Sequence, residues 1–339
     1  MSDHCLRWGL ICTARINRAL IPAIQASSRA ELAAVASRDL ARARNYAHQW
    51  GIPRAYGSYQ ALLNDPQVEV IYIALPNSLH CEWAVKAAQA GKHVLCEKPL
   101  ALSTEEVDRM IEASQRNQVV LLEAFMYRYH PQTLKAQELV SQGEIGDVHL
   151  VRAVFSYTLS RPGDVRLDPS LGGGSLWDVG CYPVSFARAI IGSEPVEVFG
   201  WQLLGDSGVD LTFVGQMRFA AMSPQGSDGA VAQFDSSFQA PFRWEAEVIG
   251  SQGTLWLETP WKPGAAREPA GLRLVRDGRE EKVAVDDVNA YLCEVEAMAD
   301  CVLDSAEPIL PLSDSRGNVV TLNALYESAR TGQVVSLPA

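Results

Sequence analysis

The sequence has no apolar run that approaches the ~20 residues needed to cross a membrane. Basic residues are also few, because 29 Lys and Arg stand against 40 Asp and Glu, for a net charge of −11. Nucleic acids and anionic membranes are bound through a basic face, so we expect neither as a partner. The N-terminus lacks the layout of a signal peptide, because Leu6–Ile11 has the pattern of a first core strand.

Cysteine pairs and histidine clusters are missing as well. The seven cysteines are an odd number and include no C-x-x-C pair, which indicates a reducing cytoplasm rather than a disulfide framework. The six histidines show no zinc-ligand spacing. We therefore predict a cytoplasmic protein without a metal site.

Hydrophobic residues make up 47% of the 339, enough for roughly two domains with full cores. In residues 1–124 short strand and helix signals alternate, and the strands lack polar alternation, which is typical of strands buried on both faces. This pattern predicts a doubly wound parallel sheet flanked by helices. The expected strands are Leu6–Ile11, Glu31–Ala36, Val68–Ile73, His93–Cys96 and Val119–Leu122, and the expected helices are Ile16–Ala26, Leu40–Trp50, Leu79–Ala90 and Thr104–Asn117.

In residues 125–339 the pattern changes to strand signals separated by Gly or Pro turns. This pattern predicts an α+β domain with a large open, mostly antiparallel sheet. The strands are expected at Val148–Thr158, Glu197–Leu204, Leu211–Ala220, Gly229–Phe238, Trp244–Gly250, Gly253–Glu258, Leu272–Arg276, Glu281–Val285 and Val334–Leu337, with helices about Ser175–Ile191, Asn289–Asp304 and Ser313–Thr331. Ser223–Gly229 is linker-like but too short to separate domains. A sheet this wide leaves a face that needs cover, so we expect a homodimer or homotetramer formed through it.

The turn after the first strand bears on cofactor binding. A dinucleotide fold carries G-x-G-x-x-G there, whereas this chain has Cys12, Ala14 and Asn17 at the three glycine positions. A phosphate site is made mainly by backbone N–H groups and the positive end of the helix, which survive these replacements. An ordinary strand-to-helix turn is the alternative for this segment.

Ser37-Arg38-Asp39 follows about 20 residues later, where an acid would bind the ribose of NAD and an Arg the extra phosphate of NADP. We interpret Asp39 as the N-cap of the next helix. Arg38, with the Ser37 hydroxyl, suits the phosphate, so we predict NADP over NAD; a solvated Arg is the alternative.

Two further strand ends carry polar residues. Leu75-Pro76-Asn77 and His80 follow the third strand, and Glu97-Lys98-Pro99 follows the fourth. Ligands of doubly wound sheets bind at the carboxyl ends of the strands, so these residues are expected to line the cofactor. The competing interpretations are a helix N-cap at Asn77 or Ser78 and a surface Lys98.

Two later motifs complete the set: Glu123-Ala124-Phe125-Met126-Tyr127-Arg128-Tyr129-His130-Pro131, and the run from Arg166 through Gly172-Gly173-Gly174-Ser175-Leu176-Trp177-Asp178 to Tyr182-Pro183. With Glu97-Lys98-Pro99, they resemble the glucose–fructose oxidoreductase / inositol dehydrogenase family (Gfo/Idh/MocA). The resemblance covers nearly the whole chain. It is strongest to the branch of NADP-linked aldose (xylose or glucose) dehydrogenases and dimeric dihydrodiol dehydrogenases.

The resemblance implies a Rossmann domain, a second domain that covers the nicotinamide, and NAD(P)-dependent oxidoreductase activity. It places the family's catalytic Lys on Lys98, its Asp on Asp178 and its His or Tyr on Tyr182. Inositol-type members have His at the last position, so Tyr182 lowers the inositol interpretation.

Oxidation of a C–OH carbon needs a proton acceptor and stabilisation of the developing oxyanion. A phenol (reference pKa about 10) and an ammonium (about 10.4) can share this work when each perturbs the other. We assign Tyr182 as the general base, with Lys98 orienting the reacting oxygen; the reverse assignment is the alternative. Asp178 is expected to contact substrate or support the site, and a capping-box role with Ser175 is its competing interpretation.

The remaining predicted site residues follow from these positions. Gly172–Gly174 would let backbone approach cofactor and substrate. Substrate contacts are expected from Phe125, Tyr129, His130, Trp177 and Asp178, and for several of these ordinary packing is an equal alternative. The predicted cofactor-binding residues are Cys12, Thr13, Ala14, Arg15, Ile16, Ser37, Arg38, Leu75, Pro76, Asn77, His80, Glu97, Lys98 and Arg166.

The sequence thus predicts a cytoplasmic NAD(P)-dependent dehydrogenase that oxidises a sugar, an aldose at C1, with NADP. A trans-dihydrodiol or cyclic-polyol dehydrogenase is one alternative, and a non-catalytic NAD(P)- or sugar-sensing protein is another. A thiol at a helix N-terminus has a lowered pKa, so we also hypothesise that Cys12 is reactive and that its modification blocks cofactor binding.

Overall fold

The computed structural model describes residues 4–220, 229–265 and 269–338, which form two compact units. The first unit runs to Tyr129 and also contains Asn289–Arg316, and the second contains His130–Val288 and the residues from Gly317. The predicted division into residues 1–124 and 125–339 therefore differs from these units at residues 125–129 and 289–316. The linker-like tract lies outside the described residues except at Gly229.

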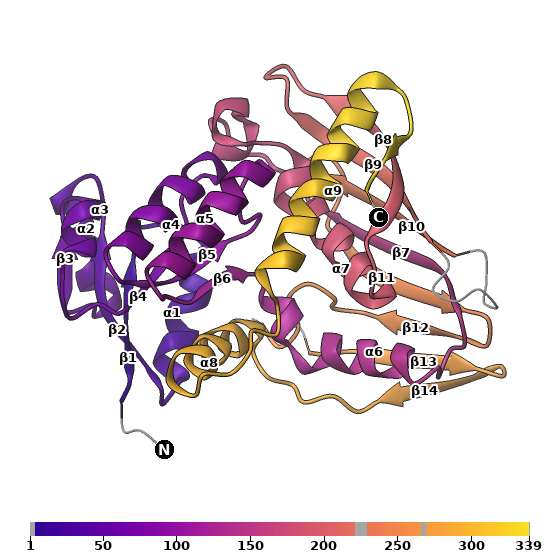
Figure 1. Cartoon of the computed structure of the whole chain (residues 1–339), viewed down its shortest axis with the longest axis horizontal. Helices are drawn as coiled ribbons and strands as arrows, with labels where there is room; N and C mark the ends of the chain where they lie inside the picture. The colour runs from indigo at the N-terminus through magenta and orange to yellow at the C-terminus, as the bar shows by residue number, and fades with distance from the viewer. Residues whose placement is uncertain (1–3, 221–228, 266–268, 339) are drawn as a thin grey trace. The chain divides into compact units, whose positions relative to one another are not determined.

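The described residues of the first unit form a six-stranded sheet, in the order β3-β2-β1-β4-β5-β6, with every pair parallel (Figure 1). The strands are β1 (Leu6–Leu10), β2 (Ala30–Ala36), β3 (Arg54–Tyr56), β4 (Val70–Ile73), β5 (His93–Glu97) and β6 (Leu121–Ala124). The strand order reverses between β1 and β4, which are neighbours. This arrangement confirms the predicted doubly wound sheet.

The helices of this unit are α1 (Asn17–Ala26), α2 (Leu40–Trp50), α3 (Tyr59–Leu63), α4 (His80–Gln89), α5 (Thr104–Arg116) and α8 (Ala290–Leu303), with 3₁₀ turns η1 (Asn77–Leu79) and η2 (Met126–Tyr129). Asp39 accepts the Arg42 N–H at 2.7 Å, which confirms its predicted N-cap role. Ser103 accepts the Glu106 N–H at 3.3 Å, while the Glu106 carboxylate returns to the N–H of Leu102. The sequence did not predict β3, α3 or η2, because they are too short to show a period.

Helix α8 follows the second unit in the chain but packs beside α1 in the first, whereas α4 packs beside α5 (Figure 1). Tyr291, Glu294, Val295 and Met298 form its buried stripe, at the i, i+3, i+4, i+7 spacing of a helix face turned to a core. This stripe explains why α8 belongs to the parallel sheet rather than to the domain whose strands precede it.

The described residues of the second unit form a nine-stranded sheet in the order β14-β13-β12-β11-β7-β10-β9-β8-β15. The strands are β7 (Val148–Ser156), β8 (Pro195–Leu204), β9 (Asp210–Phe219), β10 (Ala230–Ser237), β11 (Arg243–Gly250), β12 (Gly253–Leu257), β13 (Leu272–Arg276), β14 (Arg279–Val283) and β15 (Val335–Ser336). Only the β7–β10 pair is parallel among these strands. The predicted large, mostly antiparallel sheet is confirmed.

Helices cover one face of this sheet (Figure 1), and the described residues leave its other face open. The helices are α6 (Pro131–Ser141), α7 (Cys181–Ile191) and α9 (Leu312–Thr331), of which α6 was not predicted. Two 3₁₀ turns, η3 (Val165–Leu167) and η4 (Pro169–Leu171), and a π-helical turn, η5 (Leu176–Gly180), come before α7. Along β9, Phe213 and Met217 are buried while Val214 and Gln216 are exposed. This period of two matches a sheet with one covered face.

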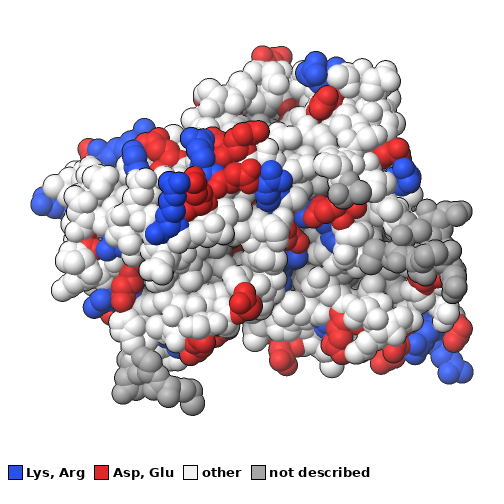
Figure 2. Space-filling view, in the orientation of Figure 1, with Lys and Arg blue, Asp and Glu red and all other residues white. Residues whose placement is uncertain are grey.

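Lys and Arg are interspersed with Asp and Glu on the face shown in Figure 2. Helices α4 and α5 each carry an ion pair between their own residues, Lys86–Glu82 and Arg116–Glu112. No helix in the described part of the chain is long and apolar enough to span a membrane.

Candidate active site

The turn between β1 and α1 is closed by a side chain that stands where a third glycine was expected. Asn17 is fully buried and its Nδ2 donates to the Cys12 carbonyl at 2.8 Å. Cys12 has a φ of +155°, a value at the edge of the region that favours glycine. The chain therefore keeps the shape of a tight turn and holds it with an amide hydrogen bond.

This turn fits a dinucleotide phosphate. Helix α1 begins at Asn17 without a side-chain cap, whereas α2, α3 and α5 are each capped by a side chain. The N–H groups of an uncapped first turn and the helix dipole form an anion site. Ala14 adds only a methyl group, and Thr13, Arg15 and Ile16 complete the turn ahead of the helix.

The structure contradicts the premise of the Cys12 hypothesis, which was a lowered pKa of the thiol. Burial raises the pKa of the thiol to about 12, against weaker lowering by hydrogen bonds and by Arg42. The Sγ also donates to the Ala74 carbonyl at 3.1 Å. Desolvation raises the pKa of the thiol more than the helix N-terminus lowers it, so Cys12 is a packed thiol in the turn between β1 and α1.

Two arginines, Arg38 and Arg42, follow β2, and Arg42 contacts the turn between β1 and α1. Arg38 is exposed and Ser37 is buried, with its hydroxyl accepting the Asp39 N–H at 3.3 Å. One helical turn further, Arg42 donates from Nε to the Thr13 hydroxyl at 2.8 Å. The sequence analysis missed Arg42, although its i+4 spacing from Arg38 was a usable signal.

His80 joins two strand-end turns instead of lining a cavity. Its ring is fully buried, with Nδ1 2.9 Å from the Pro99 carbonyl and Nε2 2.9 Å from the Leu75 carbonyl. Burial lowers the pKa of His80, and the positive charge of Lys98 lowers it further. The hydrogen bonds to the two carbonyls raise it, but by less. The predicted cofactor contact therefore does not describe this side chain. Pro76 and Asn77, in the same segment, are half-buried.

Glu97 and Lys98 end β5 with different exposures. Lys98 is half-buried and precedes a cis peptide bond to Pro99. Glu97 is 9% exposed and accepts the Tyr72 phenol at 2.5 Å, so its carboxylate is turned into the first unit. The strand end therefore combines an interior carboxylate with a more accessible ammonium.

Asp178 lies at the centre of a polar cluster in the second unit. Its Oδ2 accepts the Tyr157 hydroxyl and the Arg166 Nε, each at 2.8 Å, and Arg166 also pairs with Asp164. The Asp178 charge raises the pKa of Arg166, and burial raises the pKa of the Tyr157 phenol. Arg166, predicted to bind cofactor phosphate or substrate, is thus engaged with carboxylates. Tyr157 was not predicted.

The start of the helix that carries Asp178 is held by Asp210. This buried carboxylate accepts the Leu176 N–H at 2.8 Å and the hydroxyls of Ser175 and Tyr326 at 2.7 Å each. Ser175 makes no capping bond to Asp178, so the capping-box interpretation is wrong. The predicted helix Ser175–Ile191 is not one continuous α-helix, because the π-helical turn η5 precedes α7.

Tyr182 lies in the first turn of α7 and is 2% exposed. Its ring packs against Phe155 on β7 and Trp261, with centroids 5.3 and 5.8 Å away. Trp177 contacts the Tyr326 ring at 5.3 Å. Aromatic packing therefore holds the Tyr182 ring at the start of α7, four residues after Asp178 in the preceding π-helical turn.

Comparison with known protein families agrees with this arrangement. Residues 6–125 match the model described as an oxidoreductase family with an NAD-binding Rossmann fold, and residues 133–256 match the GFO/IDH/MocA C-terminal domain. The chain belongs to the GFO/IDH/MocA family.

Named relatives and solved structures of this family span the whole chain. D-xylose 1-dehydrogenase (NADP(+)) 2 of Haloferax volcanii is 41% identical, over 98% of this chain and 100% of that protein. The trans-1,2-dihydrobenzene-1,2-diol dehydrogenase of Xenopus laevis is 32% identical, over 91% and 93%. An aldose-aldose oxidoreductase from Caulobacter crescentus, solved with glycerol, superposes with a TM-score of 0.89 at 26% identity, over 98% and 100%.

Three residues predicted to wall the substrate pocket of this GFO/IDH/MocA chain are interior. Phe125 is 1% exposed and contacts the Tyr127 ring, and Tyr129 donates to the Glu123 carbonyl at 2.9 Å. His130 caps α6 through Nδ1 and approaches the Val288 carbonyl through Nε2. The packing alternative describes these contacts better than a pocket wall does.

Gly173 and Gly174 of this family member allow close contacts around their own loop. A Cβ on Gly173 would lie 2.5 Å from the Arg166 carbonyl oxygen, and one on Gly174, where φ is +129°, would meet Asp210 and Tyr326. These glycines therefore permit the contacts that hold η5, rather than the close approach to ligands that was predicted.

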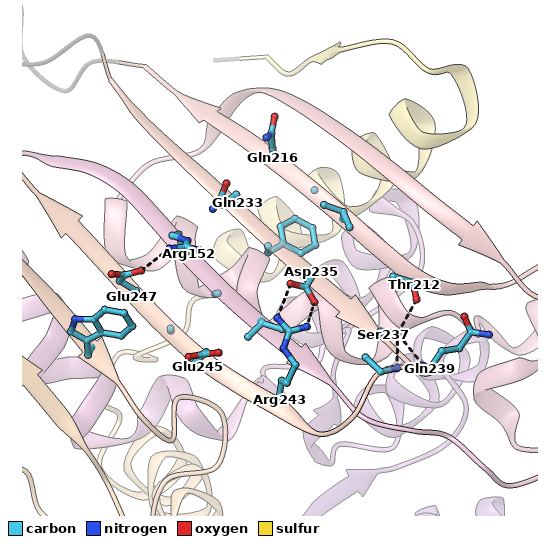
Figure 3. A pocket seen from close by; sticks show the side chains of 18 residues that line it. Arg152, Thr212, Gln216, Gln233, Asp235, Ser237, Gln239, Arg243, Glu245 and Glu247 are labelled. Atoms are coloured by element: carbon cyan, nitrogen blue, oxygen red, sulfur yellow. Dashed lines mark hydrogen bonds and ion pairs between the residues drawn. The ribbon is translucent and has the colours of Figure 1, made fainter.

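A concavity on the open face of the large sheet lies apart from these groups. Figure 3 shows Arg152, Gln216 and Gln233 along it, with ion pairs Arg152–Glu247 and Arg243–Asp235. By strand alternation these side chains point away from Phe155, which contacts Tyr182 on the covered face. The concavity is therefore across the sheet from α7. Among the described residues no group of His, Cys, Asp and Glu could hold a metal ion.

Proposed function

We propose that this protein is an NADP-preferring dehydrogenase that oxidises an aldose at C1 to the lactone. The similarity that carries the proposal is the full-length match to a D-xylose 1-dehydrogenase (NADP(+)), together with Lys98, Asp178 and Tyr182 at the family positions. A related 3-ketoreductase from Actinomadura kijaniata, 28% identical, was solved with NADP (TM-score 0.87, over 96% of this chain and 98% of that one). The reaction is assigned to the cytoplasm, in keeping with seven cysteines present as thiols.

The roles of the residues follow from the chemistry of the C1 hydroxyl. Bound NADP supplies the hydride acceptor. Tyr182, in its ionised form, takes the hydroxyl proton and becomes a neutral phenol as the C1 hydrogen leaves with its electron pair. Lys98 orients the oxygen and stabilises its developing charge. Asp178, held by Tyr157 and Arg166, orients the substrate. The chain's uncapped α1 turn holds the phosphates.

Absorbance of reduced nicotinamide tests the proposal directly. The wild-type protein, NADP and a panel of aldoses should give substrate-dependent NADPH and a lactone. Turnover of trans-dihydrodiols or cyclic polyols instead of aldoses would support the second candidate, which the 32% similarity to a dihydrodiol dehydrogenase favours. Cofactor binding with no turnover on any of these would leave the sensing protein, the candidate favoured by the replaced glycines.

Arg38→Ala should weaken NADP binding by roughly 10–100-fold and leave NAD within about twofold, because a charge-assisted contact contributes about 1.5–3 kcal/mol. Titration of the variant with NADP and NAD measures the effect. Arg44→Ala, exposed on the same helix, is the control. Equal loss with both cofactors would contradict the assignment.

We also propose that a second copy of the chain covers the open face of the large sheet. Trp201, Leu203 and Val214 remain 66%, 64% and 47% exposed there, and Trp201 pairs with Val214 across β8 and β9. Light scattering should show at least a dimer, and Trp201→Glu with Val214→Glu should give a monomer that still binds NADP. A monomeric wild-type protein would overturn this proposal.

A further inference from the structure

Four side chains form a buried carboxyl cluster below the strand end that carries Lys98. Tyr72 on β4 and Glu97 on β5 point to one face of the sheet, because Tyr72 pairs with Leu95 and Glu97 lies two residues further on. Tyr291 and Glu294 lie three apart on α8 and face the same space. Each of the four is 9% exposed or less. We call Tyr72, Glu97, Tyr291 and Glu294 the carboxyl cluster.

The two carboxyl groups of the cluster are not equivalent. Glu97 accepts the Tyr72 hydroxyl, a bond that favours its ionised form. Glu294 is 0% exposed, and neither of its side-chain oxygens has a hydrogen-bond partner among the described residues. An ionised carboxylate without donors is strongly disfavoured in such a place, whereas a protonated acid is tolerated. The asymmetry makes Glu97 the anion and Glu294 the acid.

The charges around the cluster agree with this assignment. Burial raises the pKa of Glu294 well above its ordinary value, and the negative charge of Glu97 raises it further. Tyr72, Tyr129 and Tyr291 face Glu294 from β4, η2 and α8, and burial with the nearby carboxylates raises the pKa of each. Cys293 on α8 also feels Glu294, and Glu123 on β6 and Arg128 on η2 act on Tyr129. Two carboxyl groups that repel each other in the interior share one proton.

The position of Glu97 at the end of β5 relates its negative charge to the nicotinamide half of the cofactor. In a doubly wound sheet the two halves each take one half of the dinucleotide. The phosphate turn and Arg38 belong to the β1–β3 half, so the nicotinamide belongs over the ends of β4–β6, where β5 is the middle strand. Glu97 is the last residue of β5. The oxidised nicotinamide ring is positively charged and the reduced ring is neutral, so a fixed anion at this end favours the oxidised form.

We propose that Glu97 provides a fixed negative charge that favours oxidised over reduced cofactor, and that Glu294 is a positioning residue that keeps Glu97 ionised by holding the single proton of the pair. The proposal rests on the NADP dependence proposed above. It adds a direction: the resting protein is biased toward binding NADP⁺, the form that starts an oxidation.

Cofactor binding by matched variants tests the charge. Glu97→Gln keeps an acceptor for Tyr72 and should weaken NADP⁺ about tenfold while changing NADPH less than twofold, as expected for one charge acting through a partly screened medium. Glu294→Gln replaces a neutral acid by a neutral amide and should leave both affinities within about twofold. Equal weakening of NADP⁺ and NADPH by Glu97→Gln, or an effect of Glu294→Gln as large as that of Glu97→Gln, would overturn the proposal.

Infrared difference spectroscopy reads the proton directly and needs no cofactor. The wild-type protein should show the carbonyl stretch of a buried protonated carboxyl group, and Glu294→Gln should remove it. A band removed by Glu97→Gln and kept in Glu294→Gln, with both variants folded, would reverse the assignment and refute the proposal. Failure of the wild-type protein to bind either NADP form would instead refute the proposed function, while the infrared result would still decide which acid holds the proton.

Discussion

Tyr182→Phe should lower kcat for the best aldose by about 100- to 10,000-fold, the range that loss of a positioned proton acceptor gives. The affinity for NADP should stay within about twofold, since only one oxygen atom is removed. The contacts of the ring with Phe155 and Trp261 do not involve the hydroxyl, so the packing of α7 should be kept. Steady-state kinetics, with a melting curve for each protein, measure the effect.

Tyr56→Phe is the matched control, because it also removes one phenolic hydroxyl, which donates to Asp65 in the first unit. This variant should keep its kcat. A loss of tenfold or less in Tyr182→Phe, with the larger loss in the Lys98 variant, would assign the base to Lys98, the reverse of the roles proposed here. A Tyr182→Phe enzyme as active as the wild type would remove Tyr182 from the chemistry.

Lys98→Met should lower kcat by about 100- to 1,000-fold, the size of the loss when one donor to a developing oxyanion is removed. Methionine keeps a flexible apolar side chain of similar length, so the turn between β5 and α5 should fold as before. The quantity to measure is the initial rate of NADPH formation at saturating NADP and aldose.

Lys86→Met provides the comparison, because Lys86 is half-buried, pairs with Glu82 and lies over the Trp83 ring. Its kcat should not change. If Lys98→Met retains more than about a third of the wild-type kcat, Lys98 is not part of the reaction and the proposed mechanism is wrong.

Several functional positions were predicted from local sequence because local sequence determines them. Asp39 is an N-cap because its residue type and its place before an amphipathic run decide that role. Lys98 lies at a strand end because an apolar run stops there before a proline. Neither inference requires knowledge of any distant residue.

Other positions were misread because their partners come from elsewhere in the chain. His80 looked like a cofactor contact, yet two carbonyls 5 and 19 residues away occupy its nitrogens. Cys12 had the position of a reactive thiol, but burial, which the turn sequence does not encode, raised its pKa. Each error is a contact or a degree of burial that no local pattern specifies.

The sequence by itself determined the parallel sheet, the antiparallel sheet and the strand ends where chemistry is placed, because hydrophobic period and turn residues fix which face of each element is buried. Only the tertiary structure decided that α8 returns to the first unit and brings Glu294 below Glu97, and that Asp210 holds the turn before Asp178. These arrangements join residues tens to hundreds of positions apart. Their energies come from packing and shared burial, which exist only once the chain has folded.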